Sequence, residues 1–123
     1  MLKFDLALDQ LAAREMEVGR YYLKQGHPQA AINRFRVVVE DFQTTTHTPE
    51  ALHRLVEAFL MLGLTEEAQT AGAISGLNFR SSDWYKSSYA LLTEEGVNPD
   101  NADAKGDGWM RRLYQQVLAG KWL

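Results

Sequence analysis

The sequence predicts an all-α protein of about five to six helices arranged as antiparallel hairpins. Three observations carry this prediction. Apolar residues recur every three or four positions along most of the 123-residue chain, which places them on one side of successive helices. Glycine and proline separate these segments at short intervals, and the order of helix and turn repeats after 37 positions. No hairpin dipeptide separates alternating apolar segments, so the sequence predicts no strand.

The first two helices meet at the tripeptide Gly26-His27-Pro28. Glycine can adopt the left-handed conformation that ends a helix, and proline at a first helical position loses no hydrogen bond. The tripeptide therefore ends one helix and begins the next, which runs to about Phe42, and so short a connection makes the two antiparallel. The apolar residues expected to share one face of the first helix are Phe4, Leu8, Leu11, Val18 and Tyr22.

The third and fourth helices begin at similar signals. Thr48 offers a side-chain cap and Pro49 a preset backbone angle, which begin a third helix. That helix ends at residue 61 or 62, because Gly63 follows. Thr65, followed by two glutamates, begins the fourth helix.

The C-terminal part contains a fifth helix, a loop and a last helix. Residues 96–107, rich in Gly, Asn and Asp, are predicted to be a loop, and residues 108–123 a helix and tail, with Asp107 as the helix cap. The final LAGKWL leaves three roles open: a frayed tail, a strap over the last hairpin, or a partner contact. The candidate caps of the fifth helix are Ser81, Ser82 and Asp83.

The repeated unit is a helical hairpin. The order of Gly19, Tyr22, Gly26, Ala31 and Phe35 resembles the tetratricopeptide repeat (TPR), with small residues where paired helices approach and aromatic residues between hairpins. Stacked hairpins of this kind form an α-solenoid. A shift of 37 positions pairs Tyr22 with Phe59, Leu23 with Leu60, Gly26 with Gly63, Ala31 with Ala68 and Phe42 with Phe79.

The repeat region is expected to span residues 1–95. Its repeats cover about 12–45 and 49–82, and a partial unit covers 83–95. The second repeat departs from the first, because Val56 and Gly72 stand where the first has a glycine and a phenylalanine. Its inner packing must therefore differ. About three repeats are normally needed for stability, so either the last helix seals the stack or the chain is a piece of a longer solenoid.

The first helix of each hairpin lines the concave face of such a stack, which is where we expect a protein partner. Charges of both signs with apolar residues between them suit this role. The expected positions are Ala13, Met16, Glu17, Arg20, Leu23 and Lys24 in the first repeat, and Glu50, His53, Arg54, Glu57, Leu60 and Met61 in the second. Six of these are our candidate partner-binding residues: Glu17, Arg20, Lys24, Arg54, Glu57 and Met61.

A plainer interpretation of the charged candidates stays open. Glu17 with Arg20, and Arg54 with Glu57, have the spacing of ordinary ion pairs on a helix surface. Arg20 is the exception, because Lys24 lies one turn away on the same face and the two positive charges repel. A binding role would explain why both are kept.

Composition and motifs exclude several functions. The net charge of −3, from 13 basic and 16 acidic residues, argues against a general nucleic-acid binder, and no apolar run approaches the roughly 20 residues of a membrane-spanning helix. His27 is expected at a helix cap and His53 at the surface, so the histidines predict no metal site. The sequence has no phosphate-binding glycine loop and no nucleophile motif. We expect no enzyme, no cofactor and no small-molecule substrate.

Several segments carry a narrower resemblance over residues 5–92. The most specific are VGRYYLKQG, AAINRF, VVVEDF and EALHRLVEAFLMLG. Together they resemble the C-terminal half of the BamD family, the TPR lipoproteins of the outer-membrane β-barrel assembly (Bam) complex. The tail from Asn98 onward matches only loosely.

The resemblance implies a non-catalytic scaffold that binds the periplasmic domains of the barrel subunit BamA and other Bam lipoproteins. It also implies a location at the periplasmic face of the outer membrane, where a lipidated cysteine anchors the full-length protein. In this sequence, the resemblance implies that the contact with BamA is made by Arg20 and its neighbours Glu17, Lys24 and Arg54. The chain has no cysteine and no earlier repeats, so we expect either a soluble piece of a longer family member or a cousin of this family.

Two alternatives remain open at this stage. One is a periplasmic TPR protein similar to YbgF of the Tol-Pal system, which shares this style of hairpin. The other is a generic TPR adaptor, such as a co-chaperone that grips a peptide carboxylate. The adaptor would need a groove lined by Asn and Lys, whereas the concave positions here hold Met16, Arg20, Glu50 and Arg54.

Overall fold

The computed structural model describes residues 3–100 and 108–123, which are helical apart from their turns and short loops. No strand occurs in these ranges, so the prediction of an all-α fold is confirmed. The expected cap at Asp107 and most of the expected loop at 96–107 lie outside the described residues. The helices are α1 (Lys3–Lys24), α2 (Pro28–Asp41), α3 (Thr48–Met61), α4 (Thr65–Asn78), α5 (Asp83–Glu94) and α6 (Gly108–Leu118).

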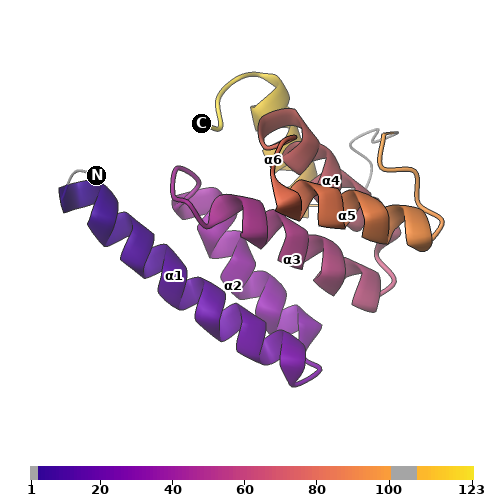
Figure 1. Ribbon diagram of the computed structural model, residues 1–123, viewed down its shortest axis with the longest axis horizontal. Coiled ribbons are helices and arrows are strands. Elements are labelled where there is room, and N and C mark those ends of the chain that lie inside the picture. Colours follow the sequence, from indigo (N-terminus) through magenta and orange to yellow (C-terminus); the bar gives the residue numbers. More distant parts are fainter. Residues whose placement is uncertain (1–2, 101–107) are drawn as a thin grey trace.

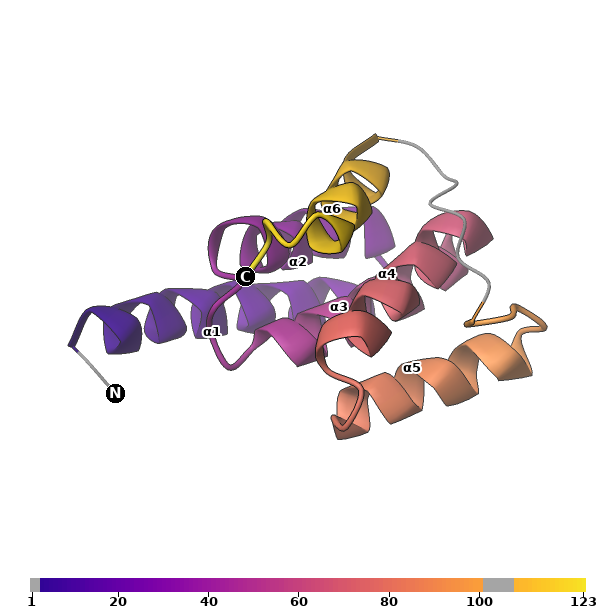
Figure 2. The same cartoon turned by 90° about the horizontal axis from the view of Figure 1, so that it is seen from above.

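Successive helices form antiparallel hairpins that stack side by side. Helix α1 packs on α2, α3 packs on α4, and the two hairpins meet where α2 contacts α3. Helices α1, α3 and α5 form one layer, and the N-terminal part of α1 extends past its neighbours (Figure 1). Helices α2 and α4 form a second layer, and α6 lies on the outer side of that layer (Figure 2).

Local signals set the helix ends. Gly26 and Gly63 adopt positive φ angles of 79° and 73° directly after the turns that close α1 and α3, as predicted. Ser82 caps α5, because its hydroxyl oxygen accepts a hydrogen bond of 3.1 Å from the Trp84 backbone N–H. His27 occupies the N-cap of α2 without a side-chain capping bond.

The predicted side-chain cap at Thr48 is wrong. The N-cap of α3 is His47, and Thr48 is the first helical residue, fully buried. The Thr48 hydroxyl lies within hydrogen-bonding distance of two carbonyl oxygens in the preceding turn, at 3.3 Å from that of Phe42 and 3.0 Å from that of Gln43. It therefore stabilises the turn between the hairpins, because the buried carbonyls there need a donor.

The buried face of α1 is also not the one that the apolar spacing indicated. Phe4 is 72% exposed and Leu11 is 52% exposed, and Leu11 lies on the solvent side of α1, because its neighbour Ala12 is fully buried. The buried residues are instead Ala12, Met16 and Gly19. Gly19 faces the ring of Phe35 on α2, and a β-carbon at Gly19 would lie 2.7 Å from the Phe35 Cζ atom. The first hairpin therefore closes through a glycine on one helix and an aromatic ring on the other.

In the second hairpin, side chains of the neighbouring helix α5 fill the space over the glycines of α4. Gly72 lies where the first repeat has Phe35, and Leu92 of α5 fills the space, 2.7 Å from where a β-carbon on Gly72 would be. One turn later, the ring of Tyr85 approaches Gly76 in the same way, at 2.9 Å. The inner packing differs from that of the first repeat, as expected, because the large side chain comes from the next helix.

Helix α6 and the tail cross the outer side of both hairpins. Helix α6 packs on α4, and its Trp109 ring lies 6.3 Å from that of Phe59 and 5.0 Å from the Arg36 guanidinium of α2. The Trp122 indole N–H donates a 2.8 Å hydrogen bond to the Val39 carbonyl oxygen, and its ring packs on Phe79. Of the three roles left open for the tail, the structure supports a strap, and this strap reaches both hairpins.

We expect Gly19→Ala to destabilise the protein although alanine is the better helix former. A methyl group at this position overlaps the Phe35 ring, and overpacking of this kind costs about 1–3 kcal/mol, more than the ~1 kcal/mol that helix propensity adds. Urea unfolding measures the change, with Glu17→Ala on an exposed part of α1 as the control. A gain in stability for Gly19→Ala would contradict the close packing.

We expect Trp122→Ala to destabilise the protein by about 3–5 kcal/mol, because a large buried ring is lost. Trp122→Phe keeps most of the ring and removes only the bond to Val39, so a loss of about 1 kcal/mol is expected. Urea unfolding of both variants separates the two contributions. If neither variant changes the unfolding midpoint, the tail does not act as a strap.

Candidate functional site

Two hollows lie next to each other on the face formed by α1, α3 and α5. The first, of about 290 Å³, lies between α1 and α3, and the second, of about 330 Å³, lies between α3 and α5. They share Glu57 and Met61, so we describe them together as the transverse groove. The groove is lined by Arg20, Leu23, Lys24, Arg54, Glu57, Leu60, Met61, Leu91 and Glu95.

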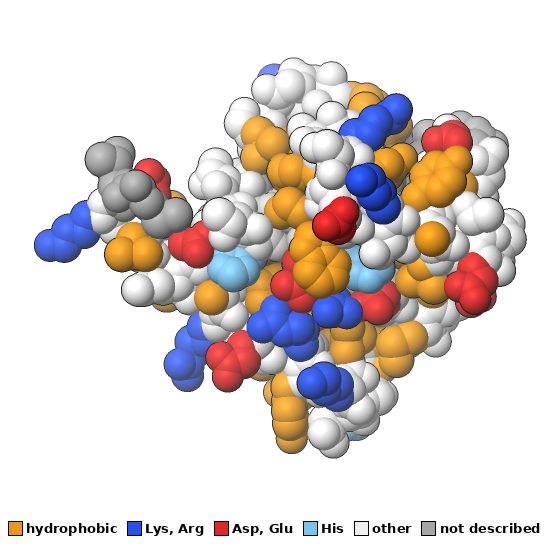
Figure 3. Space-filling view, viewed as in Figure 1, with side chains coloured by type: hydrophobic (Ala, Val, Ile, Leu, Met, Phe, Trp, Pro, Cys, Tyr) orange, Lys and Arg blue, Asp and Glu red, His pale blue; other side chains and the backbone are white. Residues whose placement is uncertain are grey.

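The structure brings five of the six candidate residues into the first hollow. These are Arg20, Lys24, Arg54, Glu57 and Met61, whereas Glu17 is exposed on α1 and does not line the groove. Charged side chains of both signs gather in the middle of this face with apolar side chains between them (Figure 3).

Two residues expected on the concave face are buried instead. Met16 is fully buried in the core, because it lies on the same side of α1 as Gly19, facing α2. His53 is only 6% exposed, because the Trp84 ring of α5 lies 5.5 Å from the imidazole. The expectation that His53 lies at the surface is therefore wrong.

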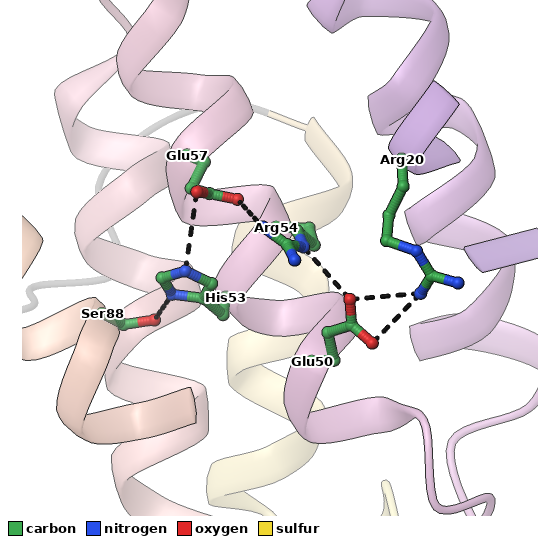
Figure 4. Close-up of polar contacts among 6 residues, drawn as sticks. All are labelled: Arg20, Glu50, His53, Arg54, Glu57 and Ser88. Carbon is green, nitrogen blue, oxygen red and sulfur yellow. Dashed lines mark hydrogen bonds and ion pairs between the residues drawn. The ribbon is translucent and has the colours of Figure 1, made fainter. Parts of the chain in front are cut away.

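Glu50 is the centre of an ion-pair network that joins α1 to α3 (Figure 4). Its two carboxylate oxygens accept hydrogen bonds of 3.1 and 3.2 Å from Arg20, and one of them accepts a 3.1 Å bond from Arg54. Arg54 also donates a 2.8 Å bond to Glu57. Arg20 therefore pairs with Glu50 and not with Glu17, while the expected pair of Arg54 with Glu57 is present.

His53 extends the network to α5. The imidazole Nδ1 lies 2.8 Å from the Ser88 hydroxyl, and Nε2 lies 3.6 Å from a Glu57 oxygen. Serine, histidine and glutamate are the groups of a hydrolase triad, but Ser88 is fully buried and lines neither hollow of the groove. The Trp84 ring packs on the His53 imidazole and also on the Arg54 guanidinium, 5.3 Å away. The arrangement therefore links α3 to α5.

The network keeps its central groups charged. Burial raises the pKa of Glu57, but hydrogen bonds and positive charge from His53 and Arg54 outweigh it, so the net pKa is lowered. Burial lowers the pKa of Arg54, but the bonds and charges of Glu57 and Glu50 outweigh it, so the net pKa is raised. Each charge is therefore stabilised by the other.

A second polar cluster attaches α1 to the turn between α2 and α3. Asp9 accepts hydrogen bonds from the Thr46 backbone N–H at 3.1 Å and from the Thr46 hydroxyl at 2.8 Å, and it lies 3.3 Å from His47 Nε2. The Thr46 bonds, followed by the nearby His47, lower the Asp9 pKa. This cluster positions α1 over the second hairpin.

The described ranges provide no metal centre and no membrane-spanning element. Within residues 3–100 and 108–123, no three His, Cys, Asp or Glu side chains come together as a metal site would require. None of the helices described there is both long enough and apolar enough to cross a bilayer.

The network escaped sequence reasoning for an identifiable reason. Glu50, His53, Arg54 and Glu57 have the spacing of one helical face, which the sequence does show. The partners of this face are Arg20 and Ser88, which lie 30 and 35 residues away from the groups they bind. No local pattern shows such pairings.

Stacked antiparallel hairpins with an open groove across their first helices define the class of helical-repeat interaction proteins. A family model described as "YfiO: Outer membrane lipoprotein" matches residues 2–74, more than half of the chain. The chain belongs to this family, and the resemblance found in the sequence is confirmed.

Two similar proteins share one name. The chain is 49% identical over 118 residues to "Outer membrane protein assembly factor BamD" of Caulobacter vibrioides, which covers 96% of this chain and 38% of that protein. It is 50% identical over 91 residues to the protein of the same name from Rickettsia prowazekii, covering 74% and 36% of the two chains. The chain thus spans little more than a third of the length of these relatives. No solved structure matches it significantly.

We expect Glu57→Gln to remove a pH-dependent part of the stability. Because the folded-state pKa of Glu57 lies below its ordinary value of 4.5, the carboxylate stabilises the protein above pH 4.5. This stabilisation is lost as the pH falls through the lowered pKa. The difference in unfolding free energy between wild type and variant should therefore be largest near neutral pH and shrink in acid.

Urea unfolding at a series of pH values measures this difference. Asp9→Asn serves as a comparison, because the Asp9 pKa is also lowered but by Thr46 and His47, which Glu57 does not contact. The losses in unfolding free energy caused by the two substitutions should add, since the two clusters share no partner. If the difference in unfolding free energy between wild type and Glu57→Gln stays constant down to acid pH, the carboxylate of Glu57 is not stabilised by the network as described.

Proposed function

We propose that the chain is a non-catalytic scaffold in outer-membrane protein assembly, and that its face of α1, α3 and α5 binds the periplasmic domains of BamA. The relatives in Caulobacter and Rickettsia support the assembly role through their name. The observation that carries the binding face is the meeting of five candidate residues in one hollow. We place the function at the periplasmic face of the outer membrane, in keeping with a family of outer membrane lipoproteins. Other Bam lipoproteins are further partners in this proposal.

The physical character of the face supports protein binding. Met61 is 54% exposed at the centre of the groove, beside the half-buried Leu23 and Leu60. Exposed apolar side chains next to charged ones are typical of a protein interface. The ion pairs of Glu50 hold Arg20 and Arg54 in place before any partner arrives, which reduces the entropy lost on binding.

The network also changes which positive charge a partner meets. Arg20 and Lys24 were expected to form an exposed pair of like charges, but Arg20 is engaged by Glu50. Lys24 is exposed and has no ion pair within the described part of the chain. We therefore assign the electrostatic contact chiefly to Lys24 and the apolar contact to Met61.

Lys24→Glu tests this assignment. Titration calorimetry with the purified periplasmic domains of BamA should give about tenfold weaker binding, a change of ~1.4 kcal/mol, because a rim charge reverses. Met61→Ala should also weaken binding through lost apolar contact. Neither variant should alter the helical circular dichroism, since both side chains are exposed.

Arg112→Glu is the matched control. Arg112 is exposed on α6, a helix that lies on the side opposite α1, α3 and α5 (Figure 2), and the variant makes the same change of charge. It should bind as wild type does. Equal weakening by Lys24→Glu and Arg112→Glu would show a general charge effect, and the absence of binding by wild type would refute the proposed partner.

A further inference from the structure

The floor of the transverse groove is an apolar strip that crosses three helices. Leu23, Leu60 and Leu91 lie near the C-terminal ends of α1, α3 and α5, and each is half-buried against the core. Met61 lies at the junction of the two hollows. Because the two hollows share Met61 and Glu57, a ligand that occupies both crosses from α1 to α5.

The charged side chains in the middle of the groove are already paired with opposite charges. Arg20, Arg54 and Glu57 line it, and each holds an ion pair within the network of Glu50. The ends differ. Lys24 lies at the α1 end and Glu95 at the α5 end, both are exposed, and neither has an ion pair among the described residues. The groove therefore has one basic end and one acidic end.

The acidic end is also electrostatically unfavourable for the protein alone. The C-terminus of a helix carries a partial negative charge, and cations stabilise it. Helix α1 ends with Lys24, which meets this preference. Helix α5 ends with Glu94 and Glu95 and has no basic residue in its last turn. A cation supplied by a partner would relieve this repulsion.

The dimensions of the groove favour an extended ligand. The two hollows lie side by side and are open to solvent, so a ligand that fills both lies along the face of the molecule. Packed helices lie about 8–10 Å apart, so the path from α1 to α5 is roughly 20 Å, the length of about six extended residues.

We propose that the transverse groove binds an extended segment of a partner protein, in which bulky apolar side chains lie between an acidic end and a basic end. The acidic end contacts Lys24, the apolar side chains cover Leu23, Met61 and Leu91, and the basic end contacts Glu95. This inference rests on the proposed function, because it gives the chemistry that a partner must present to this face.

Three synthetic octapeptides with blocked termini test the proposal. Each has leucines at alternate positions and serines between them, and the terminal residues are Asp and Lys, Asp and Asp, or Lys and Lys. Fluorescence anisotropy should show that the chain binds the mixed peptide at least about fivefold more tightly than either of the others. A peptide with blocked termini can bind in either direction, so its affinity depends on which two charges it carries and not on their order.

Two exposed substitutions should switch this preference. Lys24→Glu gives the groove two acidic ends, so it should prefer the peptide with two lysines. Glu95→Lys gives two basic ends, so it should prefer the peptide with two aspartates. Arg112→Glu on α6 is the control and should keep the preference of wild type.

The outcomes separate this inference from the proposed function. Equal affinity for all three peptides, or no binding of any, would refute the groove polarity, and so would a Lys24→Glu variant that keeps the wild-type order. If the BamA domains bind while the peptides are not distinguished, only this inference fails. If the peptides are distinguished while the BamA domains do not bind, only the proposed partner fails.

Discussion

The insertion of a large side chain into the space over a glycine is the contact on which the rest of this structure depends. Phe35 occupies the space over Gly19 within the first hairpin, and Leu92 occupies the space over Gly72 between the second hairpin and α5. Close-packed interiors do not tolerate an extra methyl group at such points. The spacing and rotation of the helices follow from these contacts, and so does the shape of the face that α1, α3 and α5 present.

Once the helices are positioned, the ion-pair network follows. Glu50 can bind Arg20 only because α1 lies beside α3 at the correct height, and His53 can reach Ser88 only because α5 is drawn toward the glycines of α4. The network uses the charges in the middle of the face for structure. It leaves Lys24 and Glu95 without ion pairs among the described residues. In the proposed binding mode, structure and binding thus use different charges of the same surface.

On the opposite side of the molecule, α6 and the tail connect the two hairpins. Helix α6 does not pair with α5 to complete a third hairpin, but lies on α4 and attaches to α2 through Trp109 and Trp122. Trp109 and Trp122 therefore connect the outer sides of the two hairpins. The family match ends within α4, whereas the similarity to the Caulobacter protein extends over nearly the whole chain. Helix α5 and the strap therefore belong to the part shared with that relative.

The sequence by itself determined the all-α class, most of the helix boundaries and the TPR-like repeat. These depend on local signals such as Gly26, Gly63 and Ser82, which act within one or two turns of the chain. Tertiary structure alone decided that Ala12, Met16 and Gly19 are buried in place of Leu11, that Arg20 binds Glu50, and that the tail is a strap. The reason is physical: helical hydrogen bonds join residues four apart, whereas these contacts join residues 16 to 83 positions apart and depend on how each helix is rotated against its neighbour.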